Sequence, residues 1–289
     1  MRFNLLPKGT IQRFRKDKKG MLGFYMLLVA IIVAVLAPFL VLYDPLSYYA
    51  EIEYLQHPPT WKYPLGTDLL GGDIYSQIVW GFRNALMLSL PSALLIGIIG
   101  TAVGLVSGYY GGWVDAVLQR ICVTFLVWPS IPLVALIVYS WGGYQAPLAI
   151  ILGVAFTLWP TTARAIRAEV MSLKNRPFIE AARVSGASSW RIVSYHILPN
   201  IIHLTFFYIT IAVASALVLE ATINFLGMGD PSIVTWGRML AFTLTMQAGY
   251  APWWTIVPPG MAITYTVLSF FLISMGLKES MNVASTRTQ

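Results

Sequence analysis

Residues 180–199 read EAARVSGASSWRIVSYHILP, a polar stretch that lies between two apolar runs of the chain. Within it the order is Glu180-Ala181-Ala182, then Gly186, then His196, and finally Leu198-Pro199. A chain that is otherwise mostly apolar seldom keeps so long a compact, basic, helix-forming segment unless something docks there. The stretch therefore predicts a docking element between two membrane crossings.

The residue types in and before this stretch predict two short helices joined by a tight corner. Pro177 suits the first turn of a helix, because its missing N–H costs no hydrogen bond there. Gly186 can adopt the left-handed conformation that ends such a helix. Ser188 or Ser189 can cap a second helix over 190–197.

The second helix is expected to end before Pro199, so that the segment forms a helix–turn–helix knob close to the membrane. The alternative interpretation is an ordinary interfacial loop that anchors two spans by its basic residues.

The composition excludes an ordinary soluble protein. Hydrophobic residues make up 57% of the 289 residues and charged residues 11%, with a mean hydropathy of +0.69. Soluble domains carry about 25% charged residues, so the chain is expected to lie in a lipid bilayer. Its net charge of +7 is interpreted as a signal of membrane orientation, not of nucleic-acid binding. Cys122, the single cysteine, is expected to be buried by packing.

Six apolar runs are long enough to cross the hydrocarbon core, which takes about 20 residues. Prolines inside them remove backbone hydrogen bonds, so kinks are expected near Pro91, Pro129 and Pro132. The first run is too long for the apolar part of a cleavable signal peptide. The sequence therefore predicts an all-α polytopic membrane protein with six transmembrane helices. The predicted spans are 21–43, 86–110, 118–140, 146–163, 201–226 and 255–277.

The basic residues set the expected orientation. With the N-terminus inside, sixteen of the 19 lysines and arginines lie on the cytoplasmic side, and only Lys62, Arg83 and Arg238 lie outside. The opposite orientation would reverse this asymmetry, which the positive-inside rule disfavours. We expect a multi-pass protein of the cytoplasmic membrane with both termini and the 180–199 segment in the cytoplasm.

Two outer segments remain. In the first, 44–85, Ile74, Ile78 and Phe82 recur on one face, which predicts an interfacial amphipathic helix over 72–82. The second, 227–252, is expected to be a re-entrant or surface-lying piece.

The 180–199 segment resembles the EAA loop of ABC-importer permeases, in which this loop plugs the membrane subunit into its ATPase. Other blocks are similar to the second, C-type permease subunit of oligopeptide, dipeptide and nickel importers, from about the first span to Met281. These blocks are YPLGTD at 63–68 with GGD at 71–73, GYYGGWVD at 108–115, WP at 159–160 with AR at 163–164, HILPN at 196–200, and FLGMG at 225–229 with WG at 236–237.

Three positions depart from the family's pattern. His196 stands where the general importer pattern has isoleucine, Gly72 stands where arginine is usual, and the tail at 275–278 lacks the Gly-Asp that precedes Leu-Arg. These departures weaken the assignment of a substrate more than the assignment of transport.

The resemblance implies an importer-permease (MetI-like) core of five helices plus an N-terminal helix. It implies a second permease subunit, two ATPase subunits that hold ATP and Mg, and an extracytoplasmic substrate-binding protein as partners. The implied division is a basic N-terminus (1–20), a first helix (21–43), an extracytoplasmic segment (44–85), the permease core (86–280) with its coupling loop (164–200), and a cytoplasmic tail (281–289). The implied ATPase-coupling residues are Glu180, Ala181, Ala182, Arg183, Gly186, Ala187, Ser188, Leu198 and Pro199.

The chain itself is expected to be non-catalytic, without cofactor or metal and without affinity for nucleic acid. It has no Gly-x-x-x-x-Gly-Lys-Ser/Thr phosphate loop, so another chain must handle ATP. His57, His196 and His203 lie at no convincing metal-ligand spacing.

Glu220 is the one acidic residue inside a predicted span. Carboxylates in the membrane are rare and commonly functional, so one interpretation places it on the solute pathway. The other is a structural hydrogen bond to a neighbouring span near the outer end.

The expected function is the permease part of an ATP-driven, binding-protein-dependent importer of peptides or similar small oligomeric solutes. An oligosaccharide or metal-complex importer of the same family is the alternative. A self-sufficient secondary transporter would be expected to show inverted repeats and several intramembrane charges. An intramembrane enzyme would need paired acids, a nucleophile with its base, or a metal site, and the spans show none of these patterns.

Overall fold

The computed structural model describes residues 10–47, 55–141, 146–246 and 251–286. These residues form helices and loops, and a single isolated β-bridge among them joins Thr67 to Asp73. Five of the described helices are long and apolar enough to cross a membrane, and a bent pair of shorter helices brings the number to six if the pair forms one span. The predicted all-α fold is confirmed, but several helix bounds differ from the prediction.

The first span, α2 (Lys18–Leu40), follows a short helix, α1 (Thr10–Phe14). Asp17 caps α2, since its side chain accepts a hydrogen bond of 2.7 Å from a backbone N–H of the first turn. The helix packs along the last span, α11 (Trp253–Thr286), and Gly23 is one of the points of close approach. A Cβ added at Gly23 would lie 2.7 Å from atoms of α11, so only glycine permits this approach.

The second span is one helix of 37 residues, α3 (Ile74–Tyr110). The helix begins twelve residues before the predicted start of the span at 86, and the predicted interfacial helix over 72–82 forms its first part. Asp73 caps the helix through a hydrogen bond of 2.9 Å to its side chain. Ile78 is buried, and so is the first residue of α3. This face therefore packs within the protein and not on a membrane surface.

Helix α3 is central to the bundle and packs on α6 (Ala146–Leu173) and α9 (Leu198–Phe225). Gly100, Gly104 and Gly108 recur every fourth residue along its contact with α6, and a Cβ at Gly104 would lie 2.7 Å from a backbone carbonyl oxygen of that helix. Small residues at this spacing let helix backbones approach closely where the hydrophobic effect cannot hold helices together.

The third span is broken. Helices α4 (Gly112–Val127) and α5 (Ser130–Ser140) meet at an angle of 91°. Pro129 lies at the break, where it lacks the N–H that a continuous helix would use. A kink was expected there, but the single span predicted over 118–140 is wrong in shape. Helix α3, in contrast, continues through Pro91.

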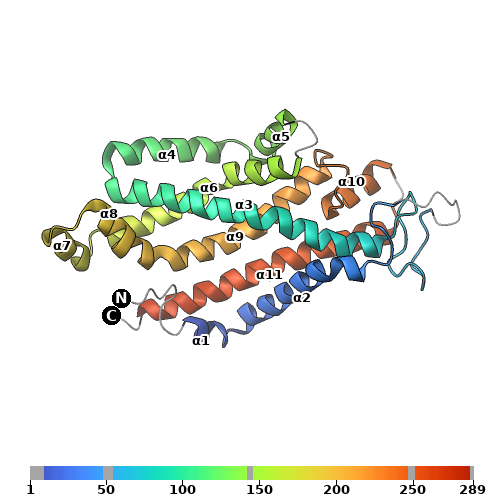
Figure 1. Ribbon diagram of the computed structural model, residues 1–289, viewed down its shortest axis with the longest axis horizontal. Coiled ribbons are helices and arrows are strands. Elements are labelled where there is room, and N and C mark those ends of the chain that lie inside the picture. Colours follow the sequence, from blue (N-terminus) through green and yellow to red (C-terminus); the bar gives the residue numbers. More distant parts are fainter. Residues whose placement is uncertain (1–9, 48–54, 142–145, 247–250, 287–289) are drawn as a thin grey trace.

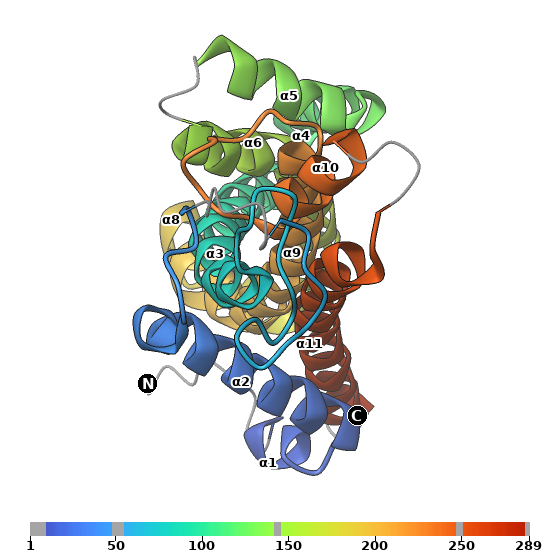
Figure 2. The same ribbon diagram turned by 90° about the vertical axis from the view of Figure 1, so that its right-hand side faces the viewer.

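The two ends of the bundle carry different elements. Figure 1 shows α1, the end of α11 and α7 (Pro177–Val184) at one end, and α10 (Trp236–Met246) with the 55–73 loop at the other. Figure 2 looks onto the second end. There the indole N–H of Trp254 donates to the carbonyl oxygen of Thr67 at 3.3 Å and so fastens the loop to α11. The 180–199 segment thus shares an end with α1 and the end of α11, and the side that faces the cytoplasm stays a prediction.

Helix α10 lies in the 227–252 segment, for which a re-entrant or surface-lying piece was predicted. Its Trp236 donates to the carbonyl oxygen of Ile78 at 3.2 Å. A Cβ at Gly237 would lie 2.1 Å from the carbonyl oxygen of Ala221. Helix α10 is therefore packed tightly against α3 and α9. Cys122 is fully buried, as predicted.

Candidate coupling site

The connection between α6 and α9, residues 174–197, is called the elbow below. Helix α6 ends at Leu173, ten residues after the predicted end of the fourth span at 163. The coupling loop predicted over 164–200 is therefore helical at both of its ends, and the part between the two long helices is short.

The first half of the elbow is α7, and its bounds follow from local chemistry. Pro177 occupies the first turn, as predicted. Gly186 has φ +83°, and its N–H donates to the carbonyl oxygen of Arg183 at 3.0 Å. The N–H of Ala187 donates to the carbonyl oxygen of Ala182 at 3.0 Å. These two bonds form a Schellman motif, which confirms the predicted glycine corner.

The second half of the elbow differs from prediction. Ser188 caps α8 (Ser189–Arg191), with its hydroxyl oxygen accepting from the N–H of Arg191 at 3.3 Å. A π-helical turn (Ile192–Ile197) then leads directly into α9. The helix break predicted at Pro199 is wrong, because Pro199 lies inside one continuous helical run over 189–225.

The π-helical turn has a physical cause in Pro199. Proline has no N–H to donate to the carbonyl oxygen four residues earlier, and its ring crowds that oxygen. Widening the turn relieves the crowding without ending the helix. The N–H of Leu198 accordingly donates to Val193, five residues back, and the Asn200 side chain donates to the carbonyl oxygen of His196 at 2.5 Å.

The elbow has a buried root. Ile179, the one described buried residue of α7, is fully buried. It belongs to an apolar cluster with Ile192 and Ile197 of the elbow and with Ile166 and Val170 of α6. A displacement of α7 would therefore press directly on the ends of α6 and α9, because close-packed side chains transmit strain.

The exposed surface of the elbow carries four large apolar or aromatic side chains among charged and small polar ones. The exposed fractions are 90% for Val184, 77% for Trp190, 64% for Tyr195 and 45% for Phe178. Exposed apolar and aromatic side chains with charged residues beside them are typical of a protein–protein contact. The sequence reasoning missed these four residues, although large apolar side chains in a polar loop were a signal that could have identified them.

The nine residues predicted to couple to an ATPase all lie at the elbow or in the first turn of α9. Glu180 lies in the first turn of α7 and Arg183 in the last, so both charges interact favourably with the helix dipole. Their coupling role stays a prediction. Exposed are Glu180, Ala181, Arg183, Gly186 and Ser188; half-buried are Ala182, Ala187, Leu198 and Pro199.

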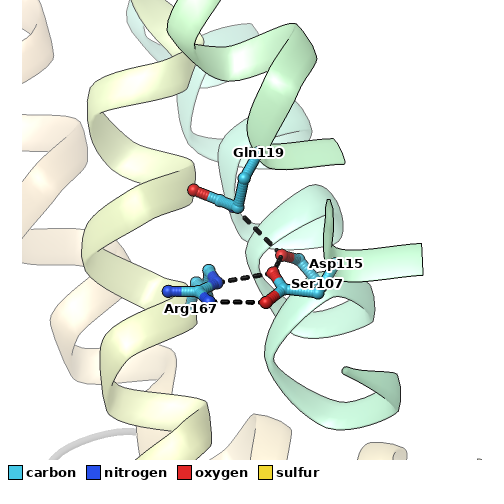
Figure 3. Close-up of polar contacts among 4 residues, drawn as sticks. All are labelled: Ser107, Asp115, Gln119 and Arg167. Atoms are coloured by element: carbon cyan, nitrogen blue, oxygen red, sulfur yellow. Dashed lines mark hydrogen bonds and ion pairs between the residues drawn. The ribbon is translucent and has the colours of Figure 1, made fainter. Parts of the chain in front are cut away.

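A polar cluster fastens α6 to the turn between α3 and α4 (Figure 3). Arg167 of α6 donates from Nε to Oδ1 of Asp115 at 2.6 Å and from Nη2 to Oδ2 at 2.5 Å. The Ser107 hydroxyl donates to the same carboxylate, and Gln119 donates to the Ser107 oxygen at 3.0 Å. This is the only salt bridge in the described part of the chain. It ties the helix that leads into the elbow to two further spans.

Sequence reasoning did not pair Arg167 with Asp115, which lie 52 positions apart. The available signal was weak: one acid at the end of a family-like block and one arginine near the end of an apolar run. Nothing in their spacing indicates that they meet.

Glu220 is buried near the C-terminal end of α9. Its Oε1 accepts a hydrogen bond of 2.8 Å from the side chain of Asn224, one turn later in the same helix. The structural interpretation had expected a bond to a neighbouring span, and among the described residues the observed partner is on its own helix instead. Whether Glu220 takes part in transport stays a prediction.

The 55–73 loop contains two buried acids. Burial raises the pKa of the Asp68 carboxyl, although hydrogen bonds from Gln77, Gly72 and Leu70 act in the opposite direction. Burial likewise raises the pKa of Asp73, against hydrogen bonds from the first turn of α3. Within the described residues, no three His, Cys, Asp or Glu side chains lie close enough to hold a metal ion.

Two family models match the sequence. Residues 100–281 match the model described as binding-protein-dependent transport system inner membrane component. Residues 8–59 match the model described as N-terminal TM domain of oligopeptide transport permease C. Together they take in the first span, the elbow and the last span.

Individual relatives are similar over nearly the whole chain. A glutathione transport system permease protein of Pectobacterium atrosepticum is 33% identical over 94% of this chain and 89% of its own length. A dipeptide transport system permease protein of Alkalihalophilus pseudofirmus is 33% identical over 94% of this chain and 88% of its own length. An oligopeptide transport system permease protein of Bacillus subtilis is 30% identical over 96% of this chain and 89% of its own length.

Proposed function

Because the chain belongs to the family of binding-protein-dependent transport system inner membrane components, we propose that it is the permease subunit of an ATP-driven importer. The solutes are peptides or similar small oligomeric molecules, and the elbow is the contact with the ATPase. The observation that supports this best is a single element that exposes large apolar side chains beside charged ones and is fully buried at its root.

The proposed coupling runs from the elbow into the membrane. ATP binding on two partner ATPase subunits draws the elbows of two permease subunits together, and hydrolysis releases them. The Ile179 cluster passes the displacement to α6 and α9. The ion pair of Arg167 with Asp115 passes the movement of α6 to α3 and α4. Packed elements of this kind switch between discrete arrangements, so a small displacement can open one side of a pathway.

The partners follow from this proposal. A second permease completes the pathway, two ATPases hold ATP and Mg, and an extracytoplasmic binding protein delivers the solute. The elbow side faces the cytoplasm, as the distribution of basic residues predicts. The chain contributes binding surface and motion, not catalysis.

The substrate class is proposed from the relatives, which are named as permeases for glutathione, dipeptides and oligopeptides. Solutes of similar size and polarity, such as oligosaccharides, are the alternative. Analysis of the ligand that the cognate binding protein retains would separate these classes.

The elbow is tested by Gly186→Arg, with Gly227→Arg as the matched control. Both glycines have positive φ, +83° and +75°, and an added Cβ would meet nothing within 4 Å at either. The two variants therefore carry similar backbone strain and the same added charge. We expect Gly186→Arg, and likewise Glu180→Arg, to abolish co-purification with the ATPase while membrane insertion stays normal. Normal co-purification of Gly186→Arg, or equal loss in both glycine variants, would contradict the proposal.

A further inference from the structure

A groove opens on the side of the bundle between α2, α9 and α11. It has a volume of about 460 Å³, which is within the range of ligand pockets. Its apolar lining comes from Phe207 and Ile211 of α9 and from Phe271 and Met275 of α11. Phe271 and Met275 are 52% and 41% exposed, so the groove is open to the surroundings of the helices.

The charged lining lies at one end of this groove. Lys19 is in the first turn of α2, and Lys278 and Glu279 lie near the end of α11. Along α11, the lining therefore changes from Phe271, through Met275, to Lys278 at the end that α11 shares with the elbow. A phospholipid has the same order, with acyl chains toward the middle of the membrane and a phosphate at its surface.

The two lysines have no acidic partner in the described residues, where Arg167 and Asp115 form the only salt bridge. Glu279 lines the same groove but lies beyond salt-bridge distance of both lysines. The three side chains together carry a net charge of +1, which a ligand with one negative charge would neutralise. Lysine binds phosphate as a point charge, and basic pockets between membrane helices on the cytoplasmic side bind anionic lipid head groups.

We infer that this groove binds one anionic phospholipid in the leaflet on the elbow side. Its phosphate lies between Lys19 and Lys278, and an acyl chain lies along Phe207, Ile211 and Phe271. Hydroxyl groups of a glycerol head group can donate to Glu279. The bound lipid joins α2 to α11 and α9 at the end where the elbow transmits motion. This inference does not depend on which solute is carried.

The test is native mass spectrometry of the full transporter, purified in detergent with its partner subunits. Phosphatidylglycerol and phosphatidylethanolamine are added in separate titrations. We expect phosphatidylglycerol to bind more tightly. Lys19→Gln and Lys278→Gln should each weaken it about fivefold, and the double variant about 25-fold, since each basic residue near an anionic lipid surface contributes about 1 kcal/mol. Met275→Trp, which narrows the groove without changing charge, should also weaken binding.

Lys18→Gln is the matched control, because Lys18 is exposed on the same helix turn but does not line the groove. Its phosphatidylglycerol affinity should equal that of the unmodified protein. Equal binding of both lipids, or unchanged phosphatidylglycerol affinity in the double lysine variant, would overturn the inference. Loss of the second permease from the double variant with unchanged lipid binding would also overturn it, since the groove would then be a subunit interface. The lipid affinities are measured without transport, so their outcome can be told apart from a failure of the proposed coupling; only the readout on the second permease rests on the proposed function.

Discussion

The ion pair between Arg167 and Asp115 lends itself to a double-mutant cycle. The variants are Asp115→Asn, Arg167→Gln and the two combined. Asparagine keeps the shape of the carboxylate and removes its charge, and glutamine removes the guanidinium that makes two hydrogen bonds. If the pair holds α6 to the turn between α3 and α4, the loss of stability in the double variant should be smaller than the sum of the losses in the two single variants.

The magnitude follows from the burial of the pair. Exposed ion pairs contribute about 0–1 kcal/mol, whereas breaking a fully buried pair costs about 3–5 kcal/mol. The two side chains are 27% and 16% exposed, so they lie between these limits. Hydrogen bonds to charged groups contribute about 1.5–3 kcal/mol. We therefore expect each single variant to lose about 2 kcal/mol of stability, with a coupling free energy of similar size.

The assay is thermal unfolding of the detergent-purified protein, followed by tryptophan fluorescence. For a chain of this size about 1 kcal/mol shifts Tm by roughly 2–4 °C, so each single variant should unfold about 4–8 °C lower. The double variant should lie close to the single ones. Arg164→Gln is the control: it removes a positive charge from an exposed position one turn earlier in α6, and should stay within about 0.5 kcal/mol of the parent.

An additive double variant would refute this reasoning, because additivity is the behaviour of residues that do not interact. So would a loss in Arg164→Gln equal to that in Arg167→Gln, which would indicate an effect of net charge alone. A functional readout separates packing from coupling. Uptake should fall in both single variants, while co-purification of the ATPase is retained because the elbow surface is unchanged.

Three further predictions concern other parts of the fold. Gly104→Val should push α3 away from α6, because the valine side chain would meet Ile166. Overpacking of this kind lowers the free energy of unfolding by about 1–3 kcal/mol. An unchanged Tm would contradict the close contact. Asp68→Asn should alter the pH dependence of the stability of the 55–73 loop. The pKa of Asp68 is raised above its ordinary value of 3.8. Between pH 3.8 and the raised pKa, the folded loop therefore binds more protons than the unfolded loop. The stability of the loop falls as the pH rises through this range. Hydrogen exchange of residues 55–73, measured against pH, should show this fall in stability in the parent and a smaller fall in the variant. The variant should also be less stable at every pH, because its hydrogen bond with Gln77 is altered. The same dependence of stability on pH in both proteins would exclude the Asp68 carboxyl as its cause. Pro199→Ala should convert the π-helical turn to an ordinary helix and rotate the elbow relative to α9, which spin-label distances between the two would detect; unchanged distances would mean that proline does not cause the wide turn.

The local features of the elbow were predictable from sequence because neighbouring residues determine them. The position of Pro177, the left-handed corner at Gly186 and the cap by Ser188 each depend on side chains within about five positions. Pro199 was misjudged because a proline can end a helix or widen it, and the contacts of the surrounding helices decide between the two. Contacts with the surrounding helices likewise decide that α6 continues to Leu173, and the local sequence does not show them.

Long-range features were not predictable in the same way. The contact of Arg167 with Asp115 depends on how α6 lies on α4, and the glycines of α3 acquire their role only once α6 approaches them. The Ile74–Ile78 face was assigned to a membrane surface, whereas it is buried against other helices.

The sequence by itself determined the membrane class, the number of apolar runs, the expected orientation and the elbow with its corner, because length, charge and turn chemistry are local properties. The tertiary structure alone decided which helix faces meet, where spans continue or bend, and which polar groups pair across the bundle. The reason is that lipid and protein interior are both apolar. Hydrophobicity shows that a helix lies in the membrane, and only packing shows which of its faces touches another helix.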